Sequence, residues 1–170
     1  MQARGFTYLG VLLVVAIQGA ALAAAATVWH TLNKREKEAE LLFIGHQFRQ
    51  AIGSYYRSTP GGVGQYPKRL EDLLLDPRHT GTVRHLRRLW RDPMTGKTEW
   101  GLLRDASGGI VGVFSLSTDP PLKTAHFDAA DRNFEGQTSY AGWQFIYEPS
   151  SSETPRGPRS VGANLRAGED

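Results

Sequence analysis

The 170-residue sequence contains no cysteine. This absence excludes disulfide bonds, cysteine-based zinc sites and thiol nucleophiles. It leaves the redox compartment open, because a chain without thiols tolerates oxidising and reducing surroundings alike. An excess of one charge sign is also missing, since 20 basic side chains against 17 acidic ones give a formal net charge of +3. So small an excess argues against a dedicated nucleic-acid-binding protein.

Catalytic motifs are missing too. The sequence has no Gly-x-Ser-x-Gly nucleophile motif, and its five histidines do not show the His-x-x-x-His or His-Glu-x-x-His spacing of metal sites. The glycine-rich stretch at residues 60–64 is not followed by the Gly-Lys-Ser/Thr of a phosphate-binding loop. We therefore do not expect an enzyme, although an enzyme anchored by a single helix stays an alternative. His46 is expected to face solvent or an interface.

Charged side chains are absent from residues 6–29, a run of 24. As a helix this run would extend about 36 Å, more than the roughly 30 Å hydrocarbon core of a bilayer. A core helix of a soluble protein would carry a regular polar face, which this run lacks. We expect a transmembrane helix. The alternative is a secretory signal peptide cut near the small residues that flank Leu22, namely Ala21 and Ala23.

The pattern changes after this run to that of an amphipathic helix. Opposite charges recur at helical spacing, as in Lys34 and Glu38. Apolar residues then share one helical face: Leu41, Ile44, Phe48, Ile52 and Tyr55.

A single continuous helix is predicted from about Thr7 to about Tyr56, since no proline occurs before Pro60. Its first half, residues 6–29, would span the membrane, and its second half, residues 30–57, would be amphipathic. Such a helix describes a stalk that is rooted in a membrane and carries a folded head.

The opening of this helix carries a specific motif. Gly5-Phe6-Thr7-Tyr8-Leu9, at the start of a chargeless helix, resembles the type IV pilin and type II secretion pseudopilin family. In that family a short basic leader ends in glycine, a membrane prepilin peptidase cuts after the glycine, and the new N-terminal phenylalanine is usually methylated. The resemblance implies a leader of residues 1–5, cleavage between Gly5 and Phe6, and methylation of Phe6.

Gly10 departs from the family pattern. The family usually has glutamate as the fifth mature residue, where it is thought to pair with a neighbour's terminal amine. Subunits without this glutamate are typically minor ones, so the resemblance favours a minor or tip subunit, with drift at this position as the alternative.

Close helix packing is expected along the same segment. Ala16, Ala20 and Ala24 repeat at every fourth residue, which is the small-xxx-small spacing of helices that approach closely in lipid. We assign Gly10 to this packing surface as well. The alternative is chance spacing in an alanine-rich run.

Residues 58–148 are predicted to form the head. Breaker residues and alternating patterns place short helices at residues 67–75 and 82–90, a turn at 92–96, and strands at 98–104, 110–117 and 143–148. The aromatic side chains of the last strand, Trp143, Phe145 and Tyr147, are expected in the core. The predicted fold class is α+β and pilin-like, with the long helix packed on a small antiparallel sheet.

Basic residues are densest around the second short helix: Arg78, His79, Arg84, His85, Arg87, Arg88 and Arg91. This basic cluster is either a solvated helix face or a surface for an acidic partner, such as a neighbouring subunit or anionic lipid.

No cofactor is expected. Calcium is an alternative, because Asp119, Asp128 and Asp131 offer hard oxygen ligands, but the calcium-loop pattern of the family's major subunits is absent. From residue 149 onward, ten of the 22 residues are proline, glycine or serine, so residues 149–170 are predicted to be a disordered tail.

With the resemblance included, the sequence predicts a structural subunit of a type II secretion or type IV pilus-like fibre that supports protein export. It would be a single-pass inner-membrane protein with its head in the periplasm. The implied partners are other pseudopilin subunits, the prepilin peptidase, the inner-membrane secretion platform and the lipid bilayer; nucleic acid is not expected. The rule that positive charges stay inside opposes this orientation, because Lys34, Arg35 and Lys37 follow the span and Arg4 precedes it. The rival prediction is a soluble periplasmic binding module released by signal peptidase.

Overall fold

The computed structural model describes residues 4–150, without the side chains of residues 4–7 and 23–28. This part of the chain is α+β, as predicted. It contains one long α-helix, three short 3-10 helices and a three-stranded antiparallel sheet in the order β1-β2-β3.

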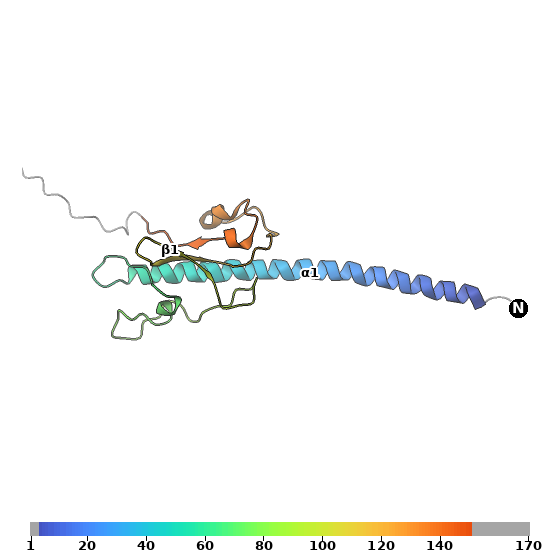
Figure 1. Ribbon diagram of the computed structural model, residues 1–170, viewed down its shortest axis with the longest axis horizontal. Helices are drawn as coiled ribbons and strands as arrows, with labels where there is room; N and C mark the ends of the chain where they lie inside the picture. The colour runs from blue at the N-terminus through green and yellow to red at the C-terminus, as the bar shows by residue number, and fades with distance from the viewer. Residues whose placement is uncertain (1–3, 151–170) are drawn as a thin grey trace, which may run out of the picture. The chain divides into compact units, whose positions relative to one another are not determined.

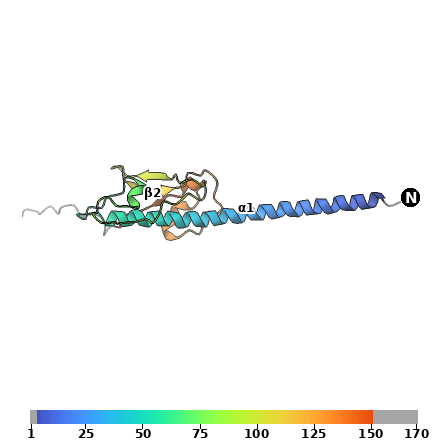
Figure 2. The ribbon, with the colours of Figure 1, turned by 90° about the horizontal axis from the view of Figure 1, so that it is seen from below.

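The long helix α1 covers Arg4–Arg57, 54 residues without a break (Figure 1, Figure 2). The prediction of one continuous helix is therefore confirmed. The helix ends where Ser58 and Thr59 donate their hydroxyl hydrogens to the carbonyls of Tyr55 and Tyr56, at 3.1 and 2.8 Å. These bonds satisfy carbonyls that have no partner inside the helix. Two glycines with positive φ then turn the chain away.

The apolar stripe predicted on the second half of α1 is buried. Its five side chains are at most 4 % exposed: Leu41, Ile44, Phe48, Ile52 and Tyr55. The amphipathic pattern therefore identified the face that packs into the head.

The chain divides into two compact units, each with its own part of α1. The first unit comprises Met1–His46, Trp90–Gly101 and Phe114–Phe145, and the second comprises Gln47–Leu89, Leu102–Val113 and Ile146–Asp170.

The core of the first unit is aromatic. The rings of Phe134 and Trp143 stack with centroids 5.7 Å apart, and Phe145 and Tyr140 meet this pair edge to face. All four side chains are fully buried. Offset-stacked and edge-to-face geometries are the favourable ones for aromatic pairs. The prediction that Trp143 and Phe145 belong to the core is confirmed, whereas Tyr147, which was expected there too, is only half-buried.

The strands are β1 (Gly101–Arg104), β2 (Ile110–Phe114) and β3 (Phe145–Ile146). The predicted hairpin is present, because the Asp105 carboxylate accepts the backbone N–H groups of Ser107 and Gly109 and so closes the turn. All three strands are shorter than predicted. Beyond β2 the Ser115 hydroxyl donates to Asp92 and its oxygen accepts the N–H of Ser117, so local side-chain bonds replace the strand pattern.

The turn predicted at residues 92–96 is confirmed. The N–H of Gly96 donates to the Asp92 carbonyl at 2.7 Å, and Gly96 has a φ of 72°, which glycine adopts without strain.

Two predicted helices need correction. The helix at residues 67–75 shrinks to the 3-10 helix η1 (Leu70–Leu73), because Asp72 accepts the N–H groups of Lys68 and Arg69 and caps the chain there. The prediction of a helix at residues 82–90 is wrong, because this segment has an irregular backbone. Its backbone forms hydrogen bonds with another segment, because the N–H groups of His85 and Leu86 both donate to the Leu73 carbonyl.

Candidate functional site

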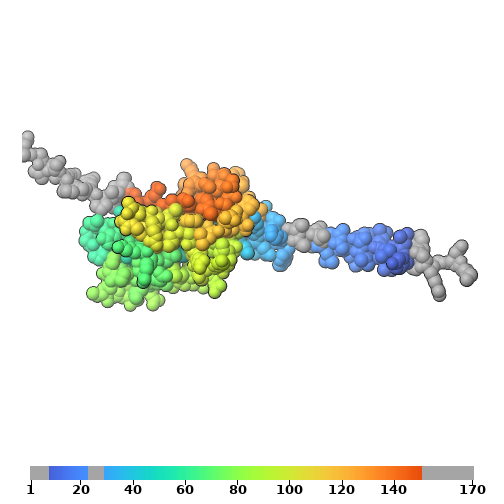
Figure 3. All heavy atoms as spheres, viewed as in Figure 1, coloured from blue at the N-terminus to red at the C-terminus, as the bar shows by residue number. Residues whose placement is uncertain are grey.

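The first part of α1 presents apolar side chains to solvent on all sides. Residues 8–22 are all exposed, and Figure 3 shows the blue spheres of this stretch with no other segment over them on the visible face. Nine large apolar side chains there are 48–72 % exposed: Tyr8, Leu9, Val11, Leu12, Leu13, Val14, Val15, Ile17 and Leu22. Contiguous apolar surface of this kind marks an interaction with a membrane or with another protein.

In the described part of the chain, no helix combines the length and the hydropathy needed to cross a membrane.

The predicted processing and packing residues all belong to α1. Gly5 and Phe6 lie in its first turn, but their side chains are outside the described residues, as is that of Ala24. Ala16 and Ala20 are exposed, and a Cβ added at Gly10 would meet no atom within 4 Å. The described packing residues are therefore uncovered within this chain.

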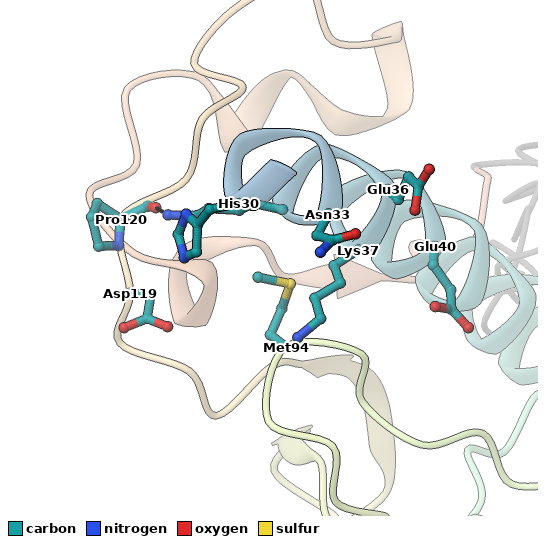
Figure 4. Close-up of a pocket in the computed structure, with 9 residues that line it drawn as sticks. His30, Asn33, Glu36, Lys37, Glu40, Met94, Asp119 and Pro120 are labelled. Carbon is teal, nitrogen blue, oxygen red and sulfur yellow. Dashed lines mark hydrogen bonds between the residues drawn. The ribbon is translucent and has the colours of Figure 1, made fainter. Parts of the chain in front are cut away.

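A groove of about 600 Å³ lies in the first unit where α1 reaches the loops. In Figure 4 Lys37 extends from α1 toward Met94, while His30 lies near Asp119 and Pro120. The full lining is His30, Asn33, Lys34, Glu36, Lys37, Glu40, Met94, Asp119 and Pro120.

Two side chains of α1 hold the loop that forms one wall of this groove. The buried Glu38 carboxylate accepts the N–H groups of Leu122 and Lys123 at 2.5 and 3.3 Å and the hydroxyl of Tyr140 at 2.8 Å. The Lys34 ammonium donates to the Pro120 carbonyl at 2.7 Å. Burial, together with the bond to Glu38, raises the pKa of Tyr140. Lys34 and Glu38, the opposite charges noted at helical spacing, thus both bind this loop.

Sequence reasoning missed the role of Glu38, although a signal was present. Glu38 lies three residues before Leu41 and therefore on the same helical face as the buried stripe. A carboxylate on a buried face needs partners of its own, which the loop supplies.

The contact between His46 and Asp131 bears on two further predictions. His46 Nε2 lies 2.6 Å from the Asp131 carboxylate, which is 3 % exposed, and the His46 ring meets Phe145 edge to face. The His46 side chain is 33 % exposed, and of the two expected settings it lies at an interface, the one between α1 and the rest of the first unit. Asp119 and Asp128 are exposed, and Asp131 is bonded to His46, so the three predicted calcium ligands are not brought together. Among the described residues no cluster of three or more metal-ligating side chains is found.

The second unit contains a buried carboxylate, Asp76, that is 1 % exposed. The Arg78 guanidinium donates to both of its oxygens, at 2.9 and 2.6 Å, and the ring nitrogens His85 Nε2 and His79 Nε2 lie 3.2 and 3.6 Å from one of them. The hydrogen bond from Arg78 holds the pKa of Asp76 well below its usual range. Arg78 also donates to the Tyr55 carbonyl at 2.8 Å, where a cation is favoured by the carbonyl end of the helix.

The basic cluster therefore does not act as one surface. Arg78, His79 and His85 bind groups inside the second unit, whereas Arg84, Arg87, Arg88 and Arg91 are exposed. The prediction of a solvated helix face is wrong, because the segment that carries these arginines is not helical.

Ser54, His85 and Asp76 form a chain of the residue types of a hydrolytic triad, but the two ring nitrogens of the histidine are exchanged relative to a triad. Ser54 Oγ lies 2.9 Å from His85 Nδ1, and His85 Nε2 lies 3.2 Å from Asp76. A triad also needs N–H groups that stabilise an oxyanion. Ser54 lies in the last turn of α1, which presents carbonyls instead. The arrangement therefore fastens the helix end to the loop.

No family model, curated protein or solved structure matches this chain. Its function must accordingly be inferred from its own residues, namely the exposed apolar segment and the groove beside it.

Proposed function

We propose that this chain is a pseudopilin-like structural subunit that assembles through its N-terminal helix into a secretion or pilus-like fibre. The observation that carries the proposal is the exposed apolar segment at residues 8–22, which continues without a break into a half of α1 whose apolar stripe is buried. Lipid covers this segment before assembly, and the helices of sister subunits cover it afterwards.

The energy of burial supports this assignment. Transferring a large aliphatic side chain from water to an apolar medium contributes about 1.5–3 kcal/mol. The eight aliphatic side chains and one tyrosine at residues 8–22, which are 48–72 % exposed, would together contribute on the order of 10 kcal/mol. A driving force of that size favours a membrane or a helical assembly over a free monomer in water.

The pilin-like fold is part of the same proposal. In the first unit Gly45 of α1 lies against the ring of Phe145, and in the second unit Gly53 lies against the ring of Tyr147. The helix backbone therefore approaches the segment around β3 closely at two points. A long helix bearing a small antiparallel sheet is the arrangement that the N-terminal motif implies.

Processing at Gly5 and a location in the inner membrane, with the head in the periplasm, complete the proposal. The glycine at position 10 favours a minor subunit, because an assembly contact through a carboxylate is not available there.

The mature N-terminus tests the proposal directly. We expect mass spectrometry of the membrane-extracted protein to find methylated Phe6 as the first residue. Gly5→Leu should block this cut, since the peptidase would meet a bulky residue, whereas Ala23→Leu should leave it unchanged. A mature chain that begins near Ala24, blocked by Ala23→Leu and unaffected by Gly5→Leu, would establish the rival soluble module.

A further inference from the structure

The groove beside residues 30–40 lies next to the proposed membrane segment, and the following inference rests on that proposed function. We propose that the groove binds the headgroup of a zwitterionic phospholipid with a primary amine, phosphatidylethanolamine. The site would hold a lipid at the point where α1 leaves the bilayer.

The depth of the groove fits a headgroup. His30 directly follows Trp29, the last residue of the chargeless run, and Trp29 is 69 % exposed. Tryptophan is enriched at the membrane–water interface. The headgroup layer on each side of the hydrocarbon core is roughly 5–8 Å thick, and five helical residues rise about 7.5 Å. The backbone of residues 30–34 would therefore lie at headgroup depth. Lys37 lies farther along α1, but helical side chains point toward the helix N-terminus, so its long side chain extends back toward this layer.

The loop wall of the groove is formed before any ligand binds. The backbone of Asp119 is bonded on both sides, because its N–H donates to Ser117 Oγ at 3.3 Å and its carbonyl accepts the N–H of Tyr140 at 3.2 Å. Pro120 is held by Lys34 at 2.7 Å. The Asp119 carboxylate itself is exposed at the groove.

The charges of the lining select the ligand class. The lining contains two lysines, Lys34 and Lys37, and three acids, Glu36, Glu40 and Asp119, so a purely anionic headgroup would meet an excess of negative charge. A ligand with both signs fits, with its phosphate toward Lys37 and Asn33 and its ammonium toward Asp119. A primary ammonium donates hydrogen bonds to a carboxylate, which the quaternary ammonium of phosphatidylcholine cannot do.

Lipid retention by the full-length protein tests this site. The protein is reconstituted in nanodiscs of phosphatidylethanolamine, phosphatidylcholine and phosphatidylglycerol in equal parts, released gently, and its retained lipids are counted by native mass spectrometry. We expect phosphatidylethanolamine to be retained in preference to the other two. Asp119→Asn and Lys37→Gln should each lower its retention about tenfold, because each removes one charge-assisted hydrogen bond. Asp128→Asn, an exposed acid of the same unit outside the groove, is the matched control and should retain the preference.

The outcomes separate this inference from the proposed function. Equal retention of the three lipids, or a preference that survives Asp119→Asn and Lys37→Gln, would overturn the headgroup site. In that case, a methylated Phe6 would still support the proposed fibre subunit. A mature chain that begins near Ala24 and stays in the aqueous phase overturns both.

Discussion

Buried carboxylates hold the loops of this molecule. Glu38, Asp92 and Asp131 in the first unit and Asp76 in the second are at most 4 % exposed. Each is bonded to backbone N–H groups, hydroxyls or the side chain of a histidine or an arginine. A buried carboxylate without such partners would cost several kcal/mol, so each one selects the loop conformation that satisfies it.

Asp76→Asn should destabilise the protein by about 2–3 kcal/mol. Removing one partner of a buried ion pair costs about 3–5 kcal/mol, and the 16 % exposure of Arg78 lets water offset part of that cost. Urea unfolding of the full-length chain in detergent, followed by tryptophan fluorescence, measures the change. Asp128→Asn is the control and should shift the free energy of unfolding by less than about 0.5 kcal/mol.

The contribution of Asp76 to stability should depend on pH. The pKa of Asp76 is lowered from an ordinary value of 3.8, so the unfolded chain takes up a proton at higher pH than the folded chain does. The stabilisation from Asp76 is therefore complete above about pH 5 and is lost as the pH falls through 3.8 and below. Arg78, His79 and His85 face this carboxylate, and they are present in both the wild type and Asp76→Asn. An equally steep loss of stability in acid for Asp76→Asn and the wild type would contradict this assignment.

Glu38 and Tyr140 should be energetically coupled. Glu38→Ala removes the acceptor for two loop N–H groups and one hydroxyl, and we expect it to cost about 2–3 kcal/mol. Tyr140→Phe removes only the hydroxyl and should cost about 1 kcal/mol. In a double-mutant cycle measured by urea unfolding, the two changes should be non-additive by at least about 0.5 kcal/mol. Additive costs would mean that the Glu38–Tyr140 bond contributes nothing to stability.

At the level of elements, local patterns predicted the long helix, its buried face, the hairpin and the turn at Asp92. Each of these depends on residues close in sequence: an unbroken run without proline, apolar residues at helical spacing, and an aspartate–glycine turn. Patterns of this kind can be read from the sequence because the structure that they specify is also local.

The missed features depend on residues far apart in the chain. Glu38 is separated from Leu122 by 84 positions and from Tyr140 by 102. The segment 82–90 has the apolar spacing of a helix, but its backbone bonds to Leu73 and its His85 side chain bonds to Ser54 and Asp76. Tertiary bonds thus overrode a weak helical preference, which a single sequence does not reveal.

Gly45→Ala should destabilise the protein although alanine is the better helix former. In an open helix the change would stabilise by about 1 kcal/mol, but the ring of Phe145 occupies the space that a Cβ would need. We expect a net loss of about 1–3 kcal/mol from this overpacking, measured by urea unfolding. Gly19→Ala is the matched control, since a Cβ there meets no atom within 4 Å. A Gly45→Ala variant as stable as Gly19→Ala would show that α1 does not approach Phe145 closely.

For the molecule as a whole, the two parts of α1 differ in how their apolar side chains are covered. The part that carries the buried stripe completes the head, whereas residues 8–22 are uncovered within this chain. Part of the apolar surface of the folded chain is therefore left without cover, and in the proposed function lipid and the helices of other subunits cover it.

Disulfide trapping can identify the helix face through which copies meet, because the chain has no cysteine of its own. Ala16→Cys and Ala20→Cys place a thiol on the same helical face, while Gln18→Cys places it about 200° around the helix. A disulfide forms when the two Cα atoms come within roughly 4.4–6.8 Å, which only closely packed faces allow. Oxidised membranes should therefore give covalent dimers with Ala16→Cys and Ala20→Cys and far fewer with Gln18→Cys on a non-reducing gel. Equal yields at the three positions would mean that the helices meet without a preferred face, and no dimer at any position would argue against their close packing.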